Sequence, residues 1–364
     1  MKFTAKRTDF TKALKAAAAC VQKNNMLPIL NNALIEADGT QVKITCANLE
    51  QRITATVDAE IERGGKTTIP AKKLFSILSK LSADSVIIDT DDRFISTLTC
   101  GTVTATIYGL TPEDFIPAPD VEYKTYVSVA PENLAELFTC AGYAVSADDS
   151  RKVLQGVLFE IQDGKILAAS TDGNRLALAE MLTDMEREEP ASYIIPAAAV
   201  AVLTHLPGDS IELYFTEKYM NASGGGVEFT TKLIEGAFPN YQHVIPEKCE
   251  HYVTIEADVL SAKLGIISEM LCDNGYAMLT ISDNKIDFQT GNDTGSIIDS
   301  MEIKETKWHI DPPVDLCFNP AFIVDAIRGG GNGEFTFGFK DGLSPCKLEF
   351  AGGAVAVVMP IRKK

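Results

Sequence analysis

The chain has 364 residues and contains one local pattern three times: a short apolar strand, then a proline, then an amphipathic helix. The prolines are Pro70, Pro196 and Pro320, which lie 126 residues (196 − 70) and 124 residues (320 − 196) apart. Because a proline at the first helical position loses no hydrogen bond, we expect each one to begin a helix. The predicted helices cover residues 71–81, 197–206 and 321–328. A repeat of this length is a domain rather than a solenoid unit.

Each repeat also has a first half, in which a strand leads into another amphipathic helix. These helices are predicted at residues 7–21, 131–144 and 257–271. Alternating strands follow them at 33–57, 156–181 and 277–301, and further strands follow the second helices at 85–110, 210–233 and 334–360. We therefore predict an α+β fold of three domains, each made of two similar halves. The domains would cover residues 1–123, 124–248 and 249–364, with polar linkers at 120–123 and 247–250.

Composition narrows the class of protein. Hydrophobic residues make up 46% and charged residues 23%, as in a soluble globular protein. No run is long enough to span a membrane and the first residues lack the apolar core of a signal peptide, so we expect a cytoplasmic protein without a membrane partner. The eight cysteines and four histidines have no metal-ligand spacing, which predicts buried thiols, no metal and no cofactor. The net charge of −17 counts against a protein that grips nucleic acid over a broad basic surface.

No motif of an enzyme stands out. The glycine clusters at 224–226 and 329–333 lack the Lys-Ser/Thr that completes a phosphate-binding loop. Neither a Gly-x-Ser-x-Gly elbow nor a His-Glu-x-x-His helix occurs. Asp172 precedes a glycine, which is typical of a turn residue rather than of a general acid or base. We expect no intrinsic catalysis.

Residues 170–177 form the most distinctive local stretch. The pair Asp172-Gly173 between alternating apolar runs predicts a tight hairpin, because glycine readily takes the positive φ of such a turn. Arg175 adds a planar set of donors beside Leu176. The corresponding stretches, 47–52 and 290–295, keep turn-forming residues but not this order. We expect a structural turn in all three repeats, with a binding role in the middle one alone.

Short segments spread along the chain carry a family resemblance. They are MKFT at 1–4, LPIL at 27–30, TIPAKK at 68–73, GVLFE at 156–160, TDGNRLA at 171–177, EGAFPNY at 235–241 and VVMPIR at 357–362. In order and spacing they resemble the bacterial DNA polymerase III β sliding clamp family. The resemblance implies the DNA clamp fold, with helices inside and antiparallel sheets outside. It also implies a head-to-tail homodimer that closes as a ring around duplex DNA.

The resemblance further implies a processivity factor within a DNA polymerase holoenzyme. Its partners would be duplex DNA of any sequence, the replicative polymerase, the clamp loader and other proteins with clamp-binding motifs. A ring that holds DNA by topology needs only weak phosphate contacts, which reconciles the function with an acidic chain. The alternative is a peptide-binding scaffold that does not encircle DNA, favoured by second-domain helices without Lys or Arg.

By matching position, the resemblance places a partner-peptide groove between the second and third domains. Its residues would be Leu154, Thr171, Gly173, Asn174, Arg175, Leu176, Pro239, His243, Val244, Asn319, Phe322, Leu343, Val357, Val358, Met359, Pro360, Ile361 and Arg362. Ordinary core is the alternative for the apolar members. Asn174 and His243 replace the family's His and Arg, which leaves the peptide preference open. The chain ends Arg362-Lys363-Lys364, and the added cations favour partners with an acidic flank.

Two further sets of residues are expected from the ring. Lys12 and Lys15 share a helix face, as do Lys73 and Lys80, so we expect them to face DNA. The whole DNA-facing set would be Lys12, Lys15, Lys73, Lys80, Arg151, Lys152, Lys263 and Arg328, for which solvated surface cations are the alternative. The dimer interface would contain Ile107, Met270 and Leu271, for which ordinary core is the alternative.

Overall fold

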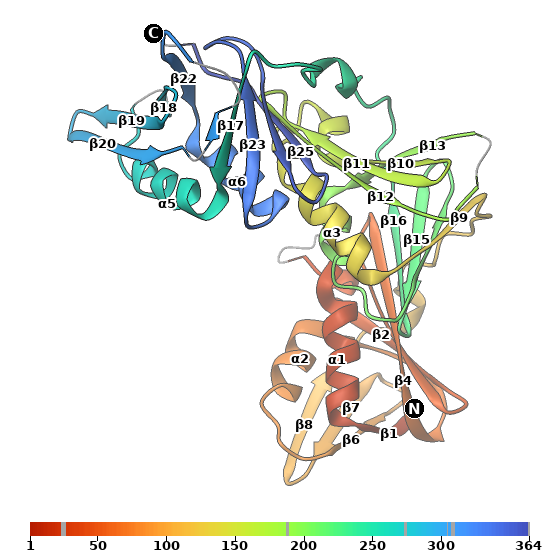
Figure 1. The fold of residues 1–364 in the computed structure, drawn as a ribbon. Coiled ribbons are helices and arrows are strands. Elements are labelled where there is room, and N and C mark those ends of the chain that lie inside the picture. Colours follow the sequence, from red (N-terminus) through yellow and green to blue (C-terminus); the bar gives the residue numbers. More distant parts are fainter. Residues whose placement is uncertain (23–26, 187–188, 273–274, 304, 307–309, 363–364) are drawn as a thin grey trace. The chain divides into compact units, whose positions relative to one another are not determined.

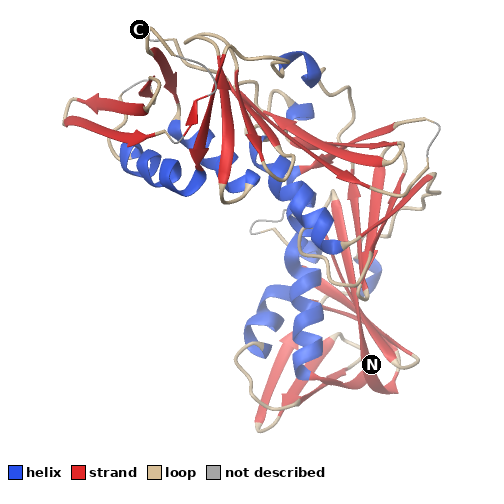
Figure 2. Cartoon of the chain, viewed as in Figure 1, coloured by secondary structure: helices blue, strands red, loops and turns tan. Residues whose placement is uncertain are grey.

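The computed structural model describes residues 1–22, 27–186, 189–272, 275–303, 305–306 and 310–362. Its contacts divide the chain into two compact units, one of residues 1–132 and 201–233 and one of residues 133–200 and 234–364. Helices and antiparallel strands follow one another in the order that the repeat predicts (Figure 1 and Figure 2). The α+β prediction is therefore confirmed. No helix in these described ranges is long and apolar enough to cross a membrane.

The first unit is built on a 12-stranded sheet. Its strands are β1 (Lys2–Lys6), β2 (Asn32–Asp38), β3 (Gln41–Ala47), β4 (Gln51–Arg63), β5 (Gly65–Pro70), β6 (Ser85–Thr90), β7 (Ile95–Cys100), β8 (Val103–Tyr108), β9 (Thr125–Val129), β14 (Ile211–Phe215), β15 (Tyr219–Gly224) and β16 (Val227–Lys232). The main path runs β8-β7-β6-β1-β4-β16-β15-β14-β9, and β2, β3 and β5 branch from it. Strands β8 and β9 are therefore the edges of this path.

Helix α1 (Arg7–Ala17) explains why the two faces of this sheet differ. It buries Phe10, Leu14 and Ala17 and contacts β3 and β4. Along β4, Ile53 and Ala55 are buried, whereas the alternate residues Arg52 and Thr54 are only partly buried. Because side chains alternate across a strand, one face of the sheet packs on helices and the other keeps polar residues. Helix α2 (Ala71–Leu78) packs beside α1.

The second unit contains two sheets. The nine-stranded sheet has the order β13-β10-β11-β12-β25-β24-β23-β17-β21, and the four-stranded sheet has the order β20-β19-β18-β22. Their strands are β10 (Gly156–Gln162), β11 (Lys165–Thr171), β12 (Arg175–Leu182), β13 (Ala191–Pro196), β17 (His251–Glu256), β18 (Ala277–Ile281), β19 (Lys285–Asn292), β20 (Gly295–Glu302), β21 (Glu305–Thr306), β22 (Val314–Phe318), β23 (Glu334–Phe339), β24 (Cys346–Phe350) and β25 (Val355–Val358).

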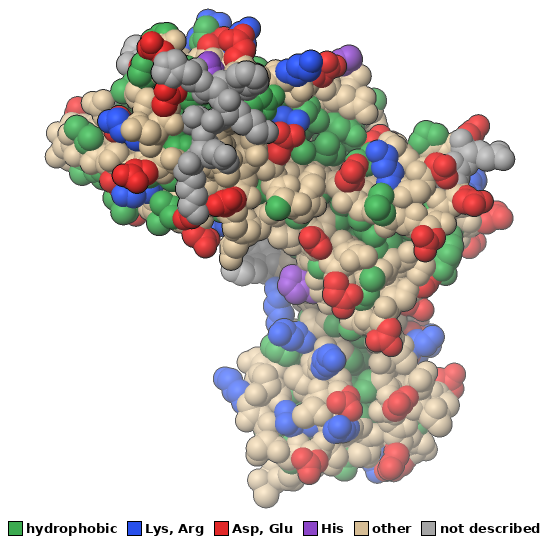
Figure 3. Space-filling view, viewed as in Figure 1, with side chains coloured by type: hydrophobic (Ala, Val, Ile, Leu, Met, Phe, Trp, Pro, Cys, Tyr) green, Lys and Arg blue, Asp and Glu red, His purple; other side chains and the backbone are tan. Residues whose placement is uncertain are grey.

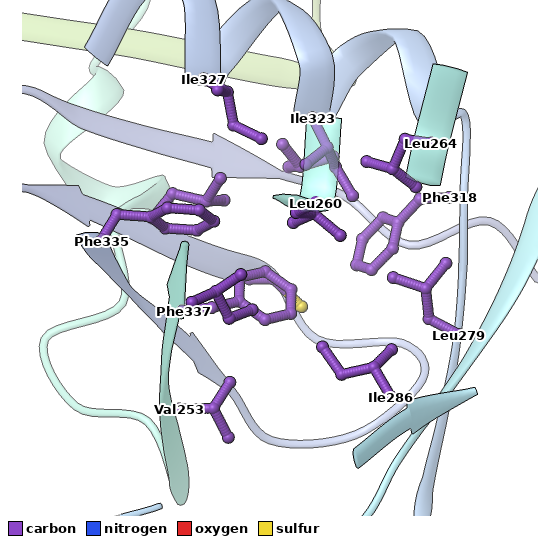
Figure 4. Packing of buried hydrophobic residues seen from close by; sticks show 14 of the residues in the cluster. Val253, Leu260, Leu264, Leu279, Ile286, Phe318, Ile323, Ile327, Phe335 and Phe337 are labelled. Carbon is purple, nitrogen blue, oxygen red and sulfur yellow. The ribbon is translucent and has the colours of Figure 1, made fainter. Parts of the chain in front are cut away.

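Helices α5 (Ala257–Ser268) and α6 (Pro320–Gly330) contact each other and cover the core of the third repeat. Leu260 and Leu264 from α5 meet Phe318 and Phe337 from the sheets (Figure 4). The rings of Phe318 and Phe337 pack edge to face, 6.2 Å between centroids. Each such buried side chain stabilises the fold by roughly 1.5–3 kcal/mol relative to an exposed one.

The first helix of each repeat begins where the sequence predicts, but the helices are shorter. Helix α1 ends at Ala17 and continues as a 3₁₀ turn, Ala18–Cys20. Helix α3 (Pro131–Ala141) likewise continues as Gly142–Ala144. Helix α2 ends at Leu78 and α5 at Ser268, three residues before their predicted ends at 81 and 271. Tight 3₁₀ geometry and irregular turns commonly replace the last turn of a helix.

The prolines of the repeat are one residue out of their predicted place in two cases. Pro320 is at the first position of α6, as expected. Pro70 and Pro196 instead end strands β5 and β13, and Pro70 precedes α2 with φ −52° and ψ 108°. Their fixed φ suits a strand end as well as a helix start, since only the missing N–H restricts a proline in a sheet. Helix α4 (Ala197–Leu203) begins directly after Pro196.

Strand pairing joins neighbouring repeats within each unit. In the first unit β16 of the second repeat pairs with β4 of the first repeat, with Thr230 opposite Arg52. In the second unit β25 of the third repeat pairs with β12 of the second repeat, with Val357 opposite Leu176. In each unit, the last strand of one repeat therefore lies beside the strand that follows the hairpin turn of the preceding repeat.

Candidate partner-binding surface and basic helix face

The predicted hairpin is confirmed and is fixed by its own side chains. Gly173 has φ +92°, a conformation that residues with a side chain rarely adopt. Asp172 Oδ1 accepts hydrogen bonds from the backbone N–H groups of Asn174 and Arg175, at 2.8 and 3.1 Å. Thr171 Oγ1 donates to the carbonyl oxygen of Arg175, at 2.6 Å. Asp172 thus acts as a turn residue, as the sequence predicts.

Arg175 fastens this turn to α6 and to the segment after α3. Its Nε donates to Asp172 Oδ2 at 3.0 Å and its Nη1 donates to Asp325 Oδ2 at 2.7 Å. Nη2 donates to the carbonyl oxygen of Tyr143 at 3.2 Å. The guanidinium also lies over the ring of Phe322, 4.6 Å from its centroid, and only 13% of the side chain is exposed. Arg175 is therefore largely engaged inside the chain, whereas the sequence suggested a donor offered to a partner.

Arg151 covers the other side of the turn. Its Nη2 donates to the carbonyl oxygen of Asp172 at 2.9 Å, and its Nε lies 3.4 Å from Asp148 Oδ2. A Cβ atom on Gly173 would lie 2.8 Å from Arg151 Nη1, so the glycine also makes room for this contact. The structure places Arg151, predicted to face DNA, beside the hairpin turn. Lys152 is exposed in the 3₁₀ turn Lys152–Leu154.

The C-terminal run lies against the same hairpin. Leu176 and Val357 face each other across β12 and β25, and the backbone N–H of Met359 donates to the carbonyl oxygen of Asn174 at 2.9 Å. Leu176 and Val357 belong to a small apolar cluster that also contains Leu158 and Tyr241, with Phe238 packed against it. The structure thus brings Thr171–Leu176 together with Val357–Met359, and we call these residues the hairpin surface. Val358 is buried, and Met359, Pro360 and Ile361 are partly exposed.

The remaining predicted members are more exposed or have local roles. Asn174, Pro239, His243 and Arg362 are exposed. Val244 and Leu343 expose 44% and 60% of their surface, and Leu154 is buried. Asn319 caps α6, its Oδ1 accepting from the N–H of Ala321 at 3.0 Å. Lys363 and Lys364 lie outside the described residues.

A group of lysines gathers over α1 and α2 (Figure 3). Lys12 and Lys15 are exposed on α1, and Lys73 is exposed on α2. Lys80 is also exposed, but it follows the end of α2 at Leu78 rather than sharing a helix face with Lys73. Within the described part of the chain these four ammonium groups have no carboxylate partner. Lys72, which the sequence pattern does not single out, is also exposed on α2, and its Nζ donates to the carbonyl oxygen of Gln22 at 2.9 Å.

The two predicted cations of the third repeat are paired. Lys263 Nζ lies 2.8 Å from Asp299 Oδ1, and this hydrogen bond lowers the pKa of the Asp299 carboxyl. Arg328 is 76% exposed, with Nη1 3.9 Å from Asp325 Oδ1. Asp299 therefore offsets the charge of Lys263, whereas Lys12, Lys15 and Lys73 have no carboxylate partner among the described residues.

Two sheet edges expose apolar side chains. Strand β8 carries Ile107, which is buried, and Tyr108, which is 73% exposed. Strand β20 carries Ile298, which is 75% exposed. Met270 and Leu271 are partly buried, and Met270 lies near Gly295 at the start of β20. Tyr108 and Ile298 could not be identified from the sequence, because alternation along a strand does not reveal whether that strand is a sheet edge.

Metal-binding clusters do not occur among the described residues. The cysteines form no disulfide, and Cys20, Cys46, Cys100, Cys317 and Cys346 are buried, as predicted for inert thiols. Burial raises the pKa of the Cys20 thiol to about 12. Cys140, Cys249 and Cys272 are partly exposed.

Comparison with known proteins agrees with this architecture. Residues 1–119 match the N-terminal domain and residues 128–240 the central domain of the DNA polymerase III beta subunit. A beta sliding clamp from Chlamydia muridarum is 24% identical over 100% of this chain and 99% of that protein. The crystal structure of the DNA polymerase III subunit beta from Pseudomonas aeruginosa has a TM-score of 0.93 at 24% identity, with both chains fully covered. A sliding clamp from Bartonella birtlesii, solved with griselimycin bound, has a TM-score of 0.93 at 26% identity over the whole of both chains.

Fold and matches together define a DNA clamp. The full-length similarity and the two domain matches then fix the family. This chain belongs to the DNA polymerase III beta subunit family, that of the bacterial beta sliding clamps.

Proposed function

We propose that this chain is a sliding clamp that encircles duplex DNA as a head-to-tail homodimer. It tethers the replicative polymerase and other partners for processive synthesis, acts on DNA inside the cell, and has no catalysis of its own. The observation that carries the proposal is the full-length match to beta sliding clamps in a chain whose α1 and α2 present exposed lysines. The hairpin surface supports the tethering role.

The lysines suit a protein that must hold DNA and still move along it. The four predicted lysines on and after α1 and α2 are exposed in a chain of net charge −17. Phosphate contacts of this kind do not read sequence, and a few of them give weak, salt-dependent binding. Retention then comes from closure of the ring. An acidic remainder of the surface disfavours binding of DNA elsewhere.

The two exposed edges support head-to-tail dimerisation. An open strand edge with exposed apolar residues is a template for pairing with another chain. Strand β8 offers Tyr108 and strand β20 offers Ile298. If β8 of one copy meets β20 of a second copy, the contact is heterologous, and two such contacts close a ring of two chains. Met270 lies next to β20 and would take part.

The hairpin surface is the proposed site for partner peptides. The clamp loader, the replicative polymerase and other proteins with clamp-binding motifs would compete for it. Met359 supplies partly exposed apolar surface there, and methionine adapts readily to different partners. Arg175 and Asp325 hold the turn in one shape, which reduces the conformational entropy lost on binding.

Charge reversal of the four lysines tests the DNA-facing assignment. We expect Lys12, Lys15, Lys73 and Lys80, all changed to Glu, to shorten retention on nicked circular DNA at low salt without unfolding the protein. The matched control reverses the same number of exposed lysines outside the helices: Lys43, Lys124, Lys218 and Lys248. Equal retention of both variants and the unchanged protein would refute the assignment.

A scaffold that binds peptides without encircling DNA is the second candidate. It is favoured by the absence of Lys and Arg from α3 and α4. Such a scaffold could be a monomer, whereas a clamp must be a ring of two chains. Sedimentation equilibrium separates the two, since a monomer at micromolar concentration would favour the scaffold.

A further inference from the structure

The first unit contains a groove beside the turn at 47–52 of the first repeat. This turn corresponds to the turn of the hairpin surface in the second repeat. The groove has a volume of about 270 Å³, and it is lined by the turn at 47–52, the segment 116–119 and side chains of β15 and β16. Leu49, Arg52, Ile116, Tyr219 and Lys232 are among its lining residues. All of them belong to the first unit.

Strand register shows which residues correspond. In the first unit Ala47 pairs with Arg52, and Arg52 pairs with Thr230. In the second unit Thr171 pairs with Leu176, and Leu176 pairs with Val357. Arg52 therefore stands in the place of Leu176, and Thr230 in that of Val357. Two residues further along the chain, Lys232 stands in the place of Met359, and each donates its backbone N–H to a carbonyl oxygen of the turn, Glu50 and Asn174 respectively, at 2.9 Å.

The turn of the groove is capped in the same way as its counterpart. Asn48 Oδ1 accepts from the N–H groups of Glu50 and Gln51, at 2.8 and 2.7 Å, as Asp172 does in the other turn. Asn48 Nδ2 donates to the carbonyl oxygen of Cys20 at 2.9 Å, which ties the turn to the 3₁₀ turn that follows α1. A small apolar cluster that includes Leu34, Ala47 and Phe115 supports this turn. In the second unit, Leu158 and Phe238 belong to the corresponding cluster.

The segment 116–119 forms the wall of the groove opposite the turn, and Arg52 holds it in place. Its Nη1 donates to the carbonyl oxygen of Ile116 at 2.7 Å, and its guanidinium lies 5.6 Å from the centroid of the Phe115 ring. Residues 116–119 read Ile-Pro-Ala-Pro, and each proline fixes its own φ. A groove with a stiff wall and a capped turn loses little entropy when a ligand enters.

The charges of the groove point to an acidic ligand. Its charged lining residues are Arg52, Lys232 and Glu50, a local excess of positive charge in a chain of net charge −17. Lys232 is exposed and has no carboxylate partner within the described residues. Leu49, 66% exposed, and the proline wall add apolar surface beside these cations.

The same sheet face continues from the groove as a row of larger side chains. Thr230 pairs with Asn221, Asn221 pairs with Tyr214, and Tyr214 pairs with Tyr126. The rings of Tyr126 and Tyr214 lie 5.1 Å apart between centroids, and Tyr126 is 50% exposed. Tyrosine is enriched in the cores of protein interfaces. The ring of Tyr123 lies 6.0 Å from that of Tyr214, and Tyr123 also hydrogen-bonds Thr230, so this row is partly covered by the chain itself and the docking site is confined to the groove.

We propose that this groove is a second docking site, for an extended segment of a partner protein that carries acidic side chains next to an aliphatic one. The aliphatic side chain would lie between Leu49 and Ile116, and a carboxylate would pair with Lys232. The hairpin surface would take apolar segments, whereas this groove would take acidic ones. The inference does not depend on which partner binds the hairpin surface.

The test uses the full chain, methyl-labelled at Ile and Leu, and the peptide acetyl-Asp-Leu-Asp-Leu-Asp-amide as probe. We expect it to shift the methyl signals of Leu49 and Ile116. Lys232→Glu should weaken binding about threefold or more, because a favourable charge pair becomes a repulsive one. Added salt should weaken it as well. Lys43→Glu, a matched charge reversal of an exposed lysine outside the groove lining, should leave the affinity unchanged.

The peptide acetyl-Asn-Leu-Asn-Leu-Asn-amide is the neutral control. Arg52→Leu is a second variant and should also weaken binding of the acidic peptide. Arg52 also holds the carbonyl oxygen of Ile116, so if Arg52→Leu does not fold, the affinity of Lys232→Glu alone tests the charge pair. The proposal is overturned if the acidic peptide leaves Leu49 and Ile116 unshifted at millimolar concentration or if the neutral peptide binds equally well. It is also overturned if Lys232→Glu binds as the unchanged chain does or if the shifts are confined to Leu176.

Discussion

Replacement of Arg175 by Ala should destabilise the second unit by about 3 kcal/mol. The Arg175 and Asp172 side chains are 13% and 17% exposed, so their hydrogen bond is well shielded and contributes about 1.5 kcal/mol. The Asp325 side chain is 33% exposed, so that pair contributes about 1 kcal/mol. Stacking on Phe322 adds about 0.5 kcal/mol.

Native-state hydrogen exchange at the amides of β12 and β25 is the appropriate assay, since a chain of two units need not unfold in one step. Arg175→Ala should increase exchange there, and Arg175→Lys should restore less than half of the loss, because an ammonium cannot reach Asp172, Asp325 and the Tyr143 carbonyl together. Arg328→Ala is the matched control. That side chain is 76% exposed and 3.9 Å from Asp325, so we expect a change below about 0.5 kcal/mol.

Equal stability of Arg175→Ala and Arg328→Ala would refute the reasoning, as would a loss below about 0.5 kcal/mol for Arg175→Ala. A double-mutant cycle of Arg175→Ala and Asp325→Ala gives an independent check. A coupling energy near 1 kcal/mol is expected for a direct, partly shielded pair.

Three further predictions concern the partner site, the two strand edges and the buried Tyr241. Met359→Ala, or removal of residues 359–364, should abolish binding of the replicative polymerase in a surface-capture assay while the dimer persists in sedimentation; normal polymerase binding would exclude the hairpin surface as the docking site. Tyr108→Asp and Ile298→Asp should each raise the dimer dissociation constant about tenfold or more in sedimentation equilibrium, because each puts a charge on an apolar strand edge, and an unchanged constant would argue against β8 and β20 as the interface. Burial and the 2.9 Å hydrogen bond to Glu160 raise the pKa of Tyr241 to about 12, so its contribution to stability is complete below about pH 10 and is lost as the pH rises through 12. Tyrosinate absorbance compared with Tyr241→Phe measures this directly, and titration of Tyr241 near pH 10 would contradict it.

The sequence predicts features that depend on neighbouring residues. Asp172 and Gly173 define the hairpin turn because its hydrogen bonds run within four residues. The repeat likewise predicts the order of helices and strands. Helix ends and the strand-ending positions of Pro70 and Pro196 were missed, since a proline's φ is compatible with both elements.

Long-range contacts could not be predicted from these patterns. Asp325 is 150 residues from Arg175, and nothing in its local sequence marks it as the partner. The exposure of Tyr108 and Ile298 depends on β8 and β20 being sheet edges, which only the strand order decides. The pairings of β4 with β16 and of β12 with β25 join repeats that the sequence separates into three domains. Those domain boundaries remain a prediction beside the two compact units.

Topological trapping tests the central proposal most directly. The protein is loaded with a clamp loader and ATP onto nicked circular duplex DNA, separated from free protein by gel filtration at moderate salt, and the DNA is then cut at one site. A clamp stays with the circle and leaves promptly after linearisation, because it can slide off an end. Failure to stay with the circle, or equal retention on circular and linear DNA, would contradict encirclement.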